Sequence, residues 1–103
     1  MDKKIIKIAR LYAQKVRDYM PVDMVILYGS HAKGTATKSS DIDIAVVVDK
    51  FKGDYLQVSA DLFGLVRDVN IQIEPVLLCR SMDKSGFLES VVKHGKIVYK
   101  AIA

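Results

Sequence analysis

The sequence is poorest in cysteine, since Cys79 is the single one among 103 residues. One cysteine excludes an internal disulfide and a thiolate metal cluster, and it fits a reducing compartment. No apolar run approaches the roughly 20 residues that span a bilayer, and the lysine-bearing N-terminus lacks the apolar core of a signal peptide. Internal repeats, low-complexity segments and interdomain linkers are also absent. We therefore expect one cytoplasmic domain over residues 1–103, without a membrane segment.

The charge balance gives only a weak indication of the partner. Half of the residues are apolar and 27% are charged, as in ordinary globular proteins. The formal net charge of +4 favours an anionic partner such as a nucleotide or nucleic acid, although solvated helix faces are the simpler explanation. Direct binding of nucleic acid is not expected.

Apolar spacing predicts helices and strands in alternation. Helices are expected over residues 5–19, 55–67 and 85–94, with a short one inside 29–38; strands are expected over 22–28, 41–48, 68–78 and 97–99. Asp54 is a plausible helix cap, and Pro75 suggests that its strand lies at a sheet edge. This order predicts an α/β (α+β) fold, in which a small mixed sheet is flanked by helices.

Two aspartates open the second predicted strand. Asp41 and Asp43 are two residues apart, so their side chains are expected on the same face of the strand. Paired carboxylates repel each other unless a cation lies between them, and hard oxygen ligands suit Mg²⁺ or Mn²⁺. Taken alone, the pair is also compatible with a turn that leads into an acidic strand start.

A glycine-serine turn follows the first predicted strand. Gly29 lets the backbone approach a ligand closely, and Ser30 opens a short helix whose amides and hydroxyl can hold phosphate oxygens. A plain turn would have the same two residues. The spacing of a Walker A loop and that of the dinucleotide-binding glycine motif are both absent.

Together these residues are similar to the signature of the polymerase-β-like nucleotidyltransferase superfamily. Gly29-Ser30 is followed by ten residues and then by Asp41-Ile42-Asp43. The fuller run over Val25–Val48 resembles the minimal nucleotidyltransferase (MNT) branch, and the element order extends the resemblance over most of the chain.

The resemblance implies transfer of NMP from a nucleoside triphosphate, with ATP the expected donor, to a hydroxyl group. Gly29 and Ser30 would bind the β- and γ-phosphates, and Asp41 and Asp43 would ligate two Mg²⁺ ions, for which Mn²⁺ could substitute. Lys33 stands where relatives often carry a basic residue and could pair with the triphosphate. An exposed helix lysine explains it equally well.

The family also uses a third carboxylate, usually an aspartate, on the next long strand. Glu74 is the candidate here, because it is the acidic member of the strand face that also carries Asn70 and Gln72. Asp68, at the strand entry, is the alternative. Glutamate is one methylene longer than aspartate, and Glu74 could instead be an ordinary exposed strand carboxylate.

The two histidines have simple structural explanations. His31 suits a surface or capping position more readily than nucleotide contact. His94 would end the last helix, where a basic side chain complements the helix dipole and needs no function.

The resemblance also implies a partner. MNT proteins are commonly paired with a helical HEPN-type toxin, which they neutralise, in some systems by adenylylating a tyrosine. The first alternative is a weakly active or inactive antitoxin that neutralises its partner by occlusion, which the glutamate in place of the third aspartate favours. A second alternative is a receiver-type phosphoacceptor domain, although the acids here open a strand instead of following one. Self-association through edge strands or apolar helix faces is also compatible with the sequence.

Overall fold

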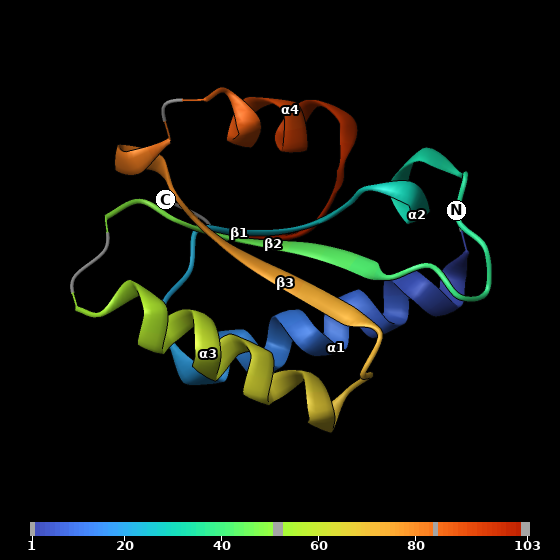
Figure 1. Ribbon diagram of the computed structural model, residues 1–103, viewed down its shortest axis with the longest axis horizontal. Coiled ribbons are helices and arrows are strands. Elements are labelled where there is room, and N and C mark those ends of the chain that lie inside the picture. The colour runs from blue at the N-terminus through green and yellow to red at the C-terminus, as the bar shows by residue number, and fades with distance from the viewer. Residues whose placement is uncertain (1, 51–52, 84, 102–103) are drawn as a thin grey trace.

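The helices and strands alternate along the chain in the predicted order (Figure 1). The computed structural model describes residues 2–50, 53–83 and 85–101. The helices are α1 (Lys3–Tyr19), α2 (Ser30–Lys33), α3 (Tyr55–Leu65) and α4 (Phe87–His94), with 3₁₀ turns η1 (Val66–Asp68) and η2 (Arg80–Met82). The strands are β1 (Met24–Tyr28), β2 (Ile42–Val48), β3 (Ile73–Cys79) and β4 (Lys96–Lys100). Over the described ranges, no helix combines the length and apolarity needed to cross a membrane.

The strands form one mixed sheet in the order β3-β2-β1-β4. β1 is antiparallel to both β2 and β4, whereas β2 and β3 are parallel. The mixed sheet confirms the predicted fold class. Pro75 lies in β3 at the sheet edge, as predicted, where its missing N–H does not have to serve strands on both sides.

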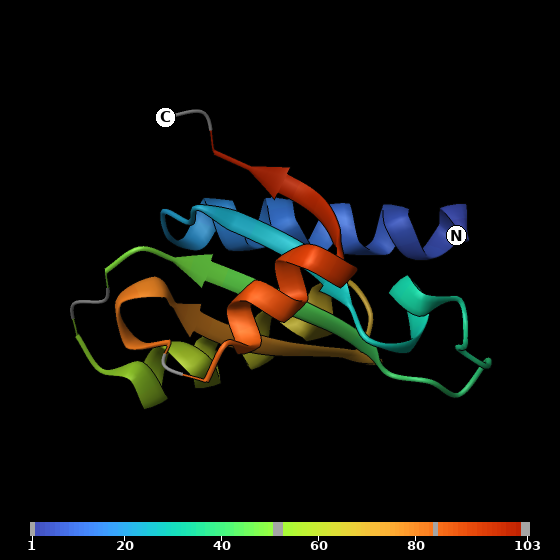
Figure 2. The same cartoon turned by 90° about the horizontal axis from the view of Figure 1, so that it is seen from above.

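Helices cover both faces of this sheet. α1 and α3 lie below it and α4 lies above it in Figure 1, and Figure 2 shows α4 over the middle of the sheet. Along β2, Ile42, Ile44 and Val46 join the core with α1 and α3, while Ala45 and Val47 pack with α4. Because strand side chains alternate between faces, this order places Asp43 on the α4 face.

Local hydrogen bonds decide where several elements begin. Asp2 accepts a bond from the amide of Lys4, so α1 starts at Lys3, and Asp54 caps α3 as predicted. The predicted strand from Asp68 is wrong at its start, because the chain continues from α3 into η1 and β3 begins at Ile73. The amides of residues 69 and 70 both donate to Val66 O, which holds this segment in a turn.

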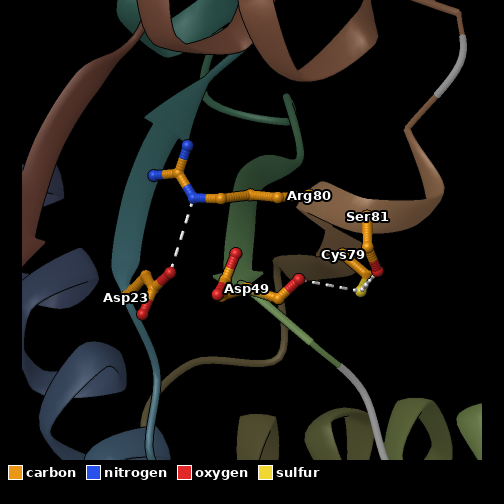
Figure 3. A network of polar contacts seen from close by, with 5 residues as sticks. All are labelled: Asp23, Asp49, Cys79, Arg80 and Ser81. Carbon is orange, nitrogen blue, oxygen red and sulfur yellow. Dashed lines mark hydrogen bonds and ion pairs between the residues drawn. The ribbon is translucent and has the colours of Figure 1, made fainter.

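A network of polar contacts joins the strand ends that lie furthest from Asp41 (Figure 3). Arg80 Nε lies 3.4 Å from Asp23 Oδ2, just before β1. Cys79 Sγ donates to the carbonyl of Asp49, just after β2, at 3.4 Å, and lies 3.2 Å from Ser81 Oγ. Cys79 is buried, as expected of a small apolar residue. These contacts tie β1, β2 and β3 together away from the candidate site.

Replacing Tyr12 by phenylalanine tests the packing of α1 on α3. The Tyr12 hydroxyl is buried and donates to Leu62 O at 2.7 Å, so Tyr12→Phe leaves that carbonyl without its partner. We expect the free energy of unfolding in urea to fall by about 1–3 kcal/mol. Tyr19→Phe is the matched control, since Tyr19 binds Asp61 at the surface and is 42% exposed. Equal losses of unfolding free energy in the two variants would show that the buried bond from Tyr12 to Leu62 O contributes no more than the exposed one.

Candidate active site

The turn between β1 and α2 brings the backbone against a carboxylate. Gly29 has a φ of 74°, in the left-handed region that favours glycine. A β-carbon at this position would lie 2.2 Å from Asp43 Oδ2 and 3.1 Å from its Cγ. Only a residue without a side chain leaves room for Asp43. The structure thus brings together the glycine turn and one of the two aspartates that the sequence singled out.

Strand register extends this contact into a row of side chains. Tyr28 of β1 pairs with Asp43 of β2, and Asp43 pairs with Glu74 of β3. Paired residues on neighbouring strands lie side by side on one face, so the three side chains form a row across the sheet. The row lies on the α4 face, beside the end of the sheet where α2 lies (Figure 2).

The electrostatics of the row show how close its acidic groups are. Burial raises the pKa of Asp43, repulsion from Asp41 adds to this, and His31 opposes it. Asp41 raises the pKa of Glu74 most, first through a hydrogen bond and then through charge repulsion, and Asp43 adds a smaller repulsion. Burial, followed by Asp43 and Glu74, raises the pKa of the Tyr28 hydroxyl. Asp41, Asp43 and Glu74 therefore interact as one acidic cluster.

The donor set of this cluster fits a hard divalent cation. A cation would relieve the repulsion that raises the pKa values of Asp43 and Glu74. In the part of the chain that the structure describes, no three His, Cys, Asp or Glu side chains already form a metal site. Mg²⁺ is commonly held by one or two carboxylates together with water and substrate phosphates, not by an all-protein cage. The cluster matches that kind of site.

The loop before β2 is tied down around Asp41. Gln72 Nε2 donates to Lys38 O at 3.2 Å, and the amide of Ile42 donates to Gln72 O at 2.8 Å. His31 Nε2 makes a longer contact of 3.5 Å with Ser40 O. His31 therefore links α2 to the aspartate loop, a supporting position that its isolated place in the sequence did not indicate.

Asp68 lies outside the acidic cluster. It belongs to η1, not to β3, and its carboxylate lies 4.0 Å from the ammonium of Lys15 on α1. The alternative third carboxylate is therefore dropped, and Glu74 is the one that the strand register places beside Asp43.

A cavity of about 380 Å³ adjoins the glycine turn. The end of β1, α2 and α4 line it through Tyr28, Gly29, Lys33, Phe87, Ser90, Val91 and His94. Lys33 thus lies beside Gly29. His94, which needed no function by sequence alone, shares the cavity. On α4, Leu88 and Val91 are buried, whereas Phe87 and Val92 are 41% and 37% exposed.

Comparisons with solved structures show the same fold in other proteins. A candidate nucleotidyltransferase from Sulfolobus solfataricus is similar at 22% identity and a TM-score of 0.68, over 94% of this chain and 81% of that one. A toxin–antitoxin structure with AMP-PNP has 24% identity and a TM-score of 0.68, over 89% and 73%. A structure of tri-AMPylated Shewanella oneidensis HEPN toxin with MNT antitoxin has 21% identity and a TM-score of 0.58, over 90% and 73%.

Sequence comparison assigns the family. No curated protein matches this chain. Residues 3–101, which include the glycine turn, the acidic cluster and α4, match the family described as polymerase beta, nucleotidyltransferase. The chain therefore belongs to the polymerase beta nucleotidyltransferase family.

Proposed function

We propose that this chain transfers AMP from ATP to a hydroxyl group of a partner protein and releases pyrophosphate, with two Mg²⁺ ions held by Asp41, Asp43 and Glu74. The partner is a helical toxin of the HEPN type, which the transfer neutralises. Residues 1–103 act as one minimal nucleotidyltransferase domain, in the cytoplasm, where ATP and Mg²⁺ are supplied. Membership of the nucleotidyltransferase family supports the reaction class.

One observation carries the proposal, namely the contact between Gly29 and Asp43. The 2.2 Å that would separate a β-carbon of residue 29 from Asp43 Oδ2 leaves space for backbone alone. A phosphate chain bound along the Gly29-Ser30 turn would therefore run directly past the carboxylates. Such positioning supplies much of the rate gain in phosphoryl-type transfer, because the reacting groups need little further ordering.

Each side chain has a role that follows from its place. Ser30 and Lys33 would hold the β- and γ-phosphates beside Gly29, while Asp41 and Asp43 would be the principal metal ligands. The bound cations would neutralise charge on the attacking and leaving oxygens. Glu74 stands next to Asp43, where its carboxylate would accept the proton of the acceptor hydroxyl on Oε.

Similar structures support a toxin as the acceptor. One of them contains a tri-AMPylated HEPN toxin together with an MNT antitoxin, and another is a toxin–antitoxin complex with AMP-PNP. Both share the fold of this chain, and each contains a protein partner in addition to a nucleotide or its AMP product. A nucleotide donor and a protein acceptor are therefore our proposal for this chain as well.

Neutralisation by occlusion is the second candidate function. Glu74 stands where the family usually has aspartate, and the described residues contain no ready-made group of three metal ligands. A chain with this site could bind its partner and block it without chemistry. The two functions differ in whether nucleotide is needed, so experiments on the carboxylates separate them.

Neutralising both aspartates tests the enzymatic function. Asp41→Asn with Asp43→Asn should lower Mg²⁺-dependent transfer of label from α-labelled ATP to a co-purifying partner by at least roughly a hundredfold. Stability should not fall, because the fold raises the pKa of Asp43 and thus disfavours its charged form. Asp49→Asn, at the opposite end of β2, is the control and should transfer normally. Continued labelling by the double variant would rule out the enzyme.

Adding a methyl group at residue 29 tests whether activity depends on the contact between Gly29 and Asp43. Gly29 and Gly34 have φ values of 74° and 78°, so alanine strains both backbones alike. Only at Gly29 does the β-carbon meet Asp43, since nothing lies within 4 Å of one at Gly34. We expect Gly29→Ala to abolish transfer and Gly34→Ala to retain most of it, as measured by single-turnover labelling. Similar activity in the two variants would contradict the role of the contact.

Changing Glu74 separates catalysis from binding. Glu74→Gln keeps the size of the side chain but removes the proton acceptor, so kcat should fall roughly tenfold to a hundredfold while ATP affinity changes little. Glu89→Gln, the same exchange at an exposed position of α4, is the control. If Glu74→Gln neutralises the partner as well as the unmodified chain does, and neither requires ATP, occlusion is the better account.

A further inference from the structure

The cavity beside Gly29 has a wall that the proposed reaction has not used. That wall is one face of α4, because the residues that line the cavity are spaced by three and four along the helix. They are Phe87, Ser90, Val91 and His94. The opposite wall is formed by the end of β1 and by Lys33 of α2. Figure 1 shows α4 and α2 as separate elements on the upper side of the sheet.

The polar lining of this cavity is basic. Lys33 and His94 come from different elements, and no carboxylate is among the residues that line the space. Within the described ranges, neither side chain is in an ion pair, since the pairs present join Lys15 to Asp68 and Arg80 to Asp23. Two basic groups on one cavity whose lining residues include no carboxylate favour an anionic ligand.

The ring of His94 is oriented by its own helix. Its Nδ1 lies 3.2 Å from the carbonyl oxygen of Ser90, which can only accept, so Nδ1 is the donor in this contact. Nε2 is then the nitrogen left for a ligand, and in the protonated ring it is a donor too. Ser90 is also among the residues that line this cavity.

We propose that α4 completes the triphosphate site: His94 and the Ser90 hydroxyl bind the β- and γ-phosphates from the side opposite Lys33. This inference rests on the proposed function, in which the phosphate chain of ATP runs from the acidic cluster along the Gly29-Ser30 turn. Gly29 lines the cavity and lies directly against Asp43. The β- and γ-phosphates of a nucleotide bound there would therefore enter the cavity. The phosphate tail carries most of the charge of ATP, and it therefore suits this basic lining better than the nucleoside does. Tyr28 and Phe87 pack edge to face, with ring centroids 5.8 Å apart, and form an apolar part of the wall.

Calorimetry with ligands that do and do not carry the tail tests this assignment. In Mg²⁺ buffer, His94→Gln should bind ATP and inorganic tripolyphosphate roughly tenfold more weakly, because one charge-assisted hydrogen bond is lost. Ser90→Ala should have a smaller effect in the same direction. The affinity for AMP, which has no β- or γ-phosphate, should stay unchanged in both variants. His94→Arg should retain tripolyphosphate binding, because it keeps a positive donor in the cavity.

Lys93→Gln is the matched control, since Lys93 neighbours His94 on α4 but does not line this cavity. Thermal unfolding of each variant identifies any loss that comes from misfolding. Unchanged tripolyphosphate binding in His94→Gln, or an equal loss for AMP, would overturn the inference. Binding of tripolyphosphate through His94 without NMP transfer would overturn the proposed function alone. If the unmodified chain transfers NMP but His94→Gln binds ATP and tripolyphosphate as tightly as the unmodified chain does, this inference alone is overturned.

Discussion

The site depends on one steric constraint, the contact of the Gly29 backbone with the carboxylate of Asp43. These residues are far enough apart in sequence that only the antiparallel pairing of β1 and β2 brings them together. With the pairing fixed, Tyr28 stands beside Asp43, and the turn that follows has no room for a β-carbon. The parallel pairing of β2 with β3 then adds Glu74 to the row. Strand β2 thus positions both the glycine turn, through its pairing with β1, and the acidic cluster, through its pairing with β3.

The constraint has an electrostatic cost. Burial and repulsion from Asp41 raise the pKa of Asp43, and Asp41 and Asp43 raise the pKa of Glu74, so the fold holds charges together that would separate in water. Anchors around the cluster oppose this tendency, among them the bonds from Gln72 to the loop that precedes β2. At the other end of the sheet, the contacts of Asp23, Asp49 and Cys79 hold the strand ends together (Figure 3). These contacts hold the strands together at the end of the sheet opposite the acidic cluster.

Sequence reasoning reached the parts of the site that are governed by local rules. Apolar periodicity predicted the fold class, and the resemblance to the nucleotidyltransferase signature singled out Gly29 and Asp43, which the structure brings into contact. It failed for Asp68, because local hydrogen bonds extend a helical turn into the predicted strand. Sequence reasoning identified Glu74 but could not show that it pairs with Asp43, because the register between β2 and β3 is set by packing across the sheet. His94 was missed for a similar reason: which face of α4 meets the cavity depends on how the helix sits on the sheet.

The most direct test of the central claim is where a paramagnetic divalent ion binds. Mn²⁺ added to the isotopically labelled chain with a non-hydrolysable ATP analogue broadens the NMR signals of nearby nuclei. The account predicts early broadening at Gly29, Asp41, Asp43 and Glu74. Signals from Asp23, Asp49 and Cys79, at the opposite end of the sheet, should remain sharp under the same conditions. Early broadening at that opposite end, or none at the acidic cluster, would contradict the account.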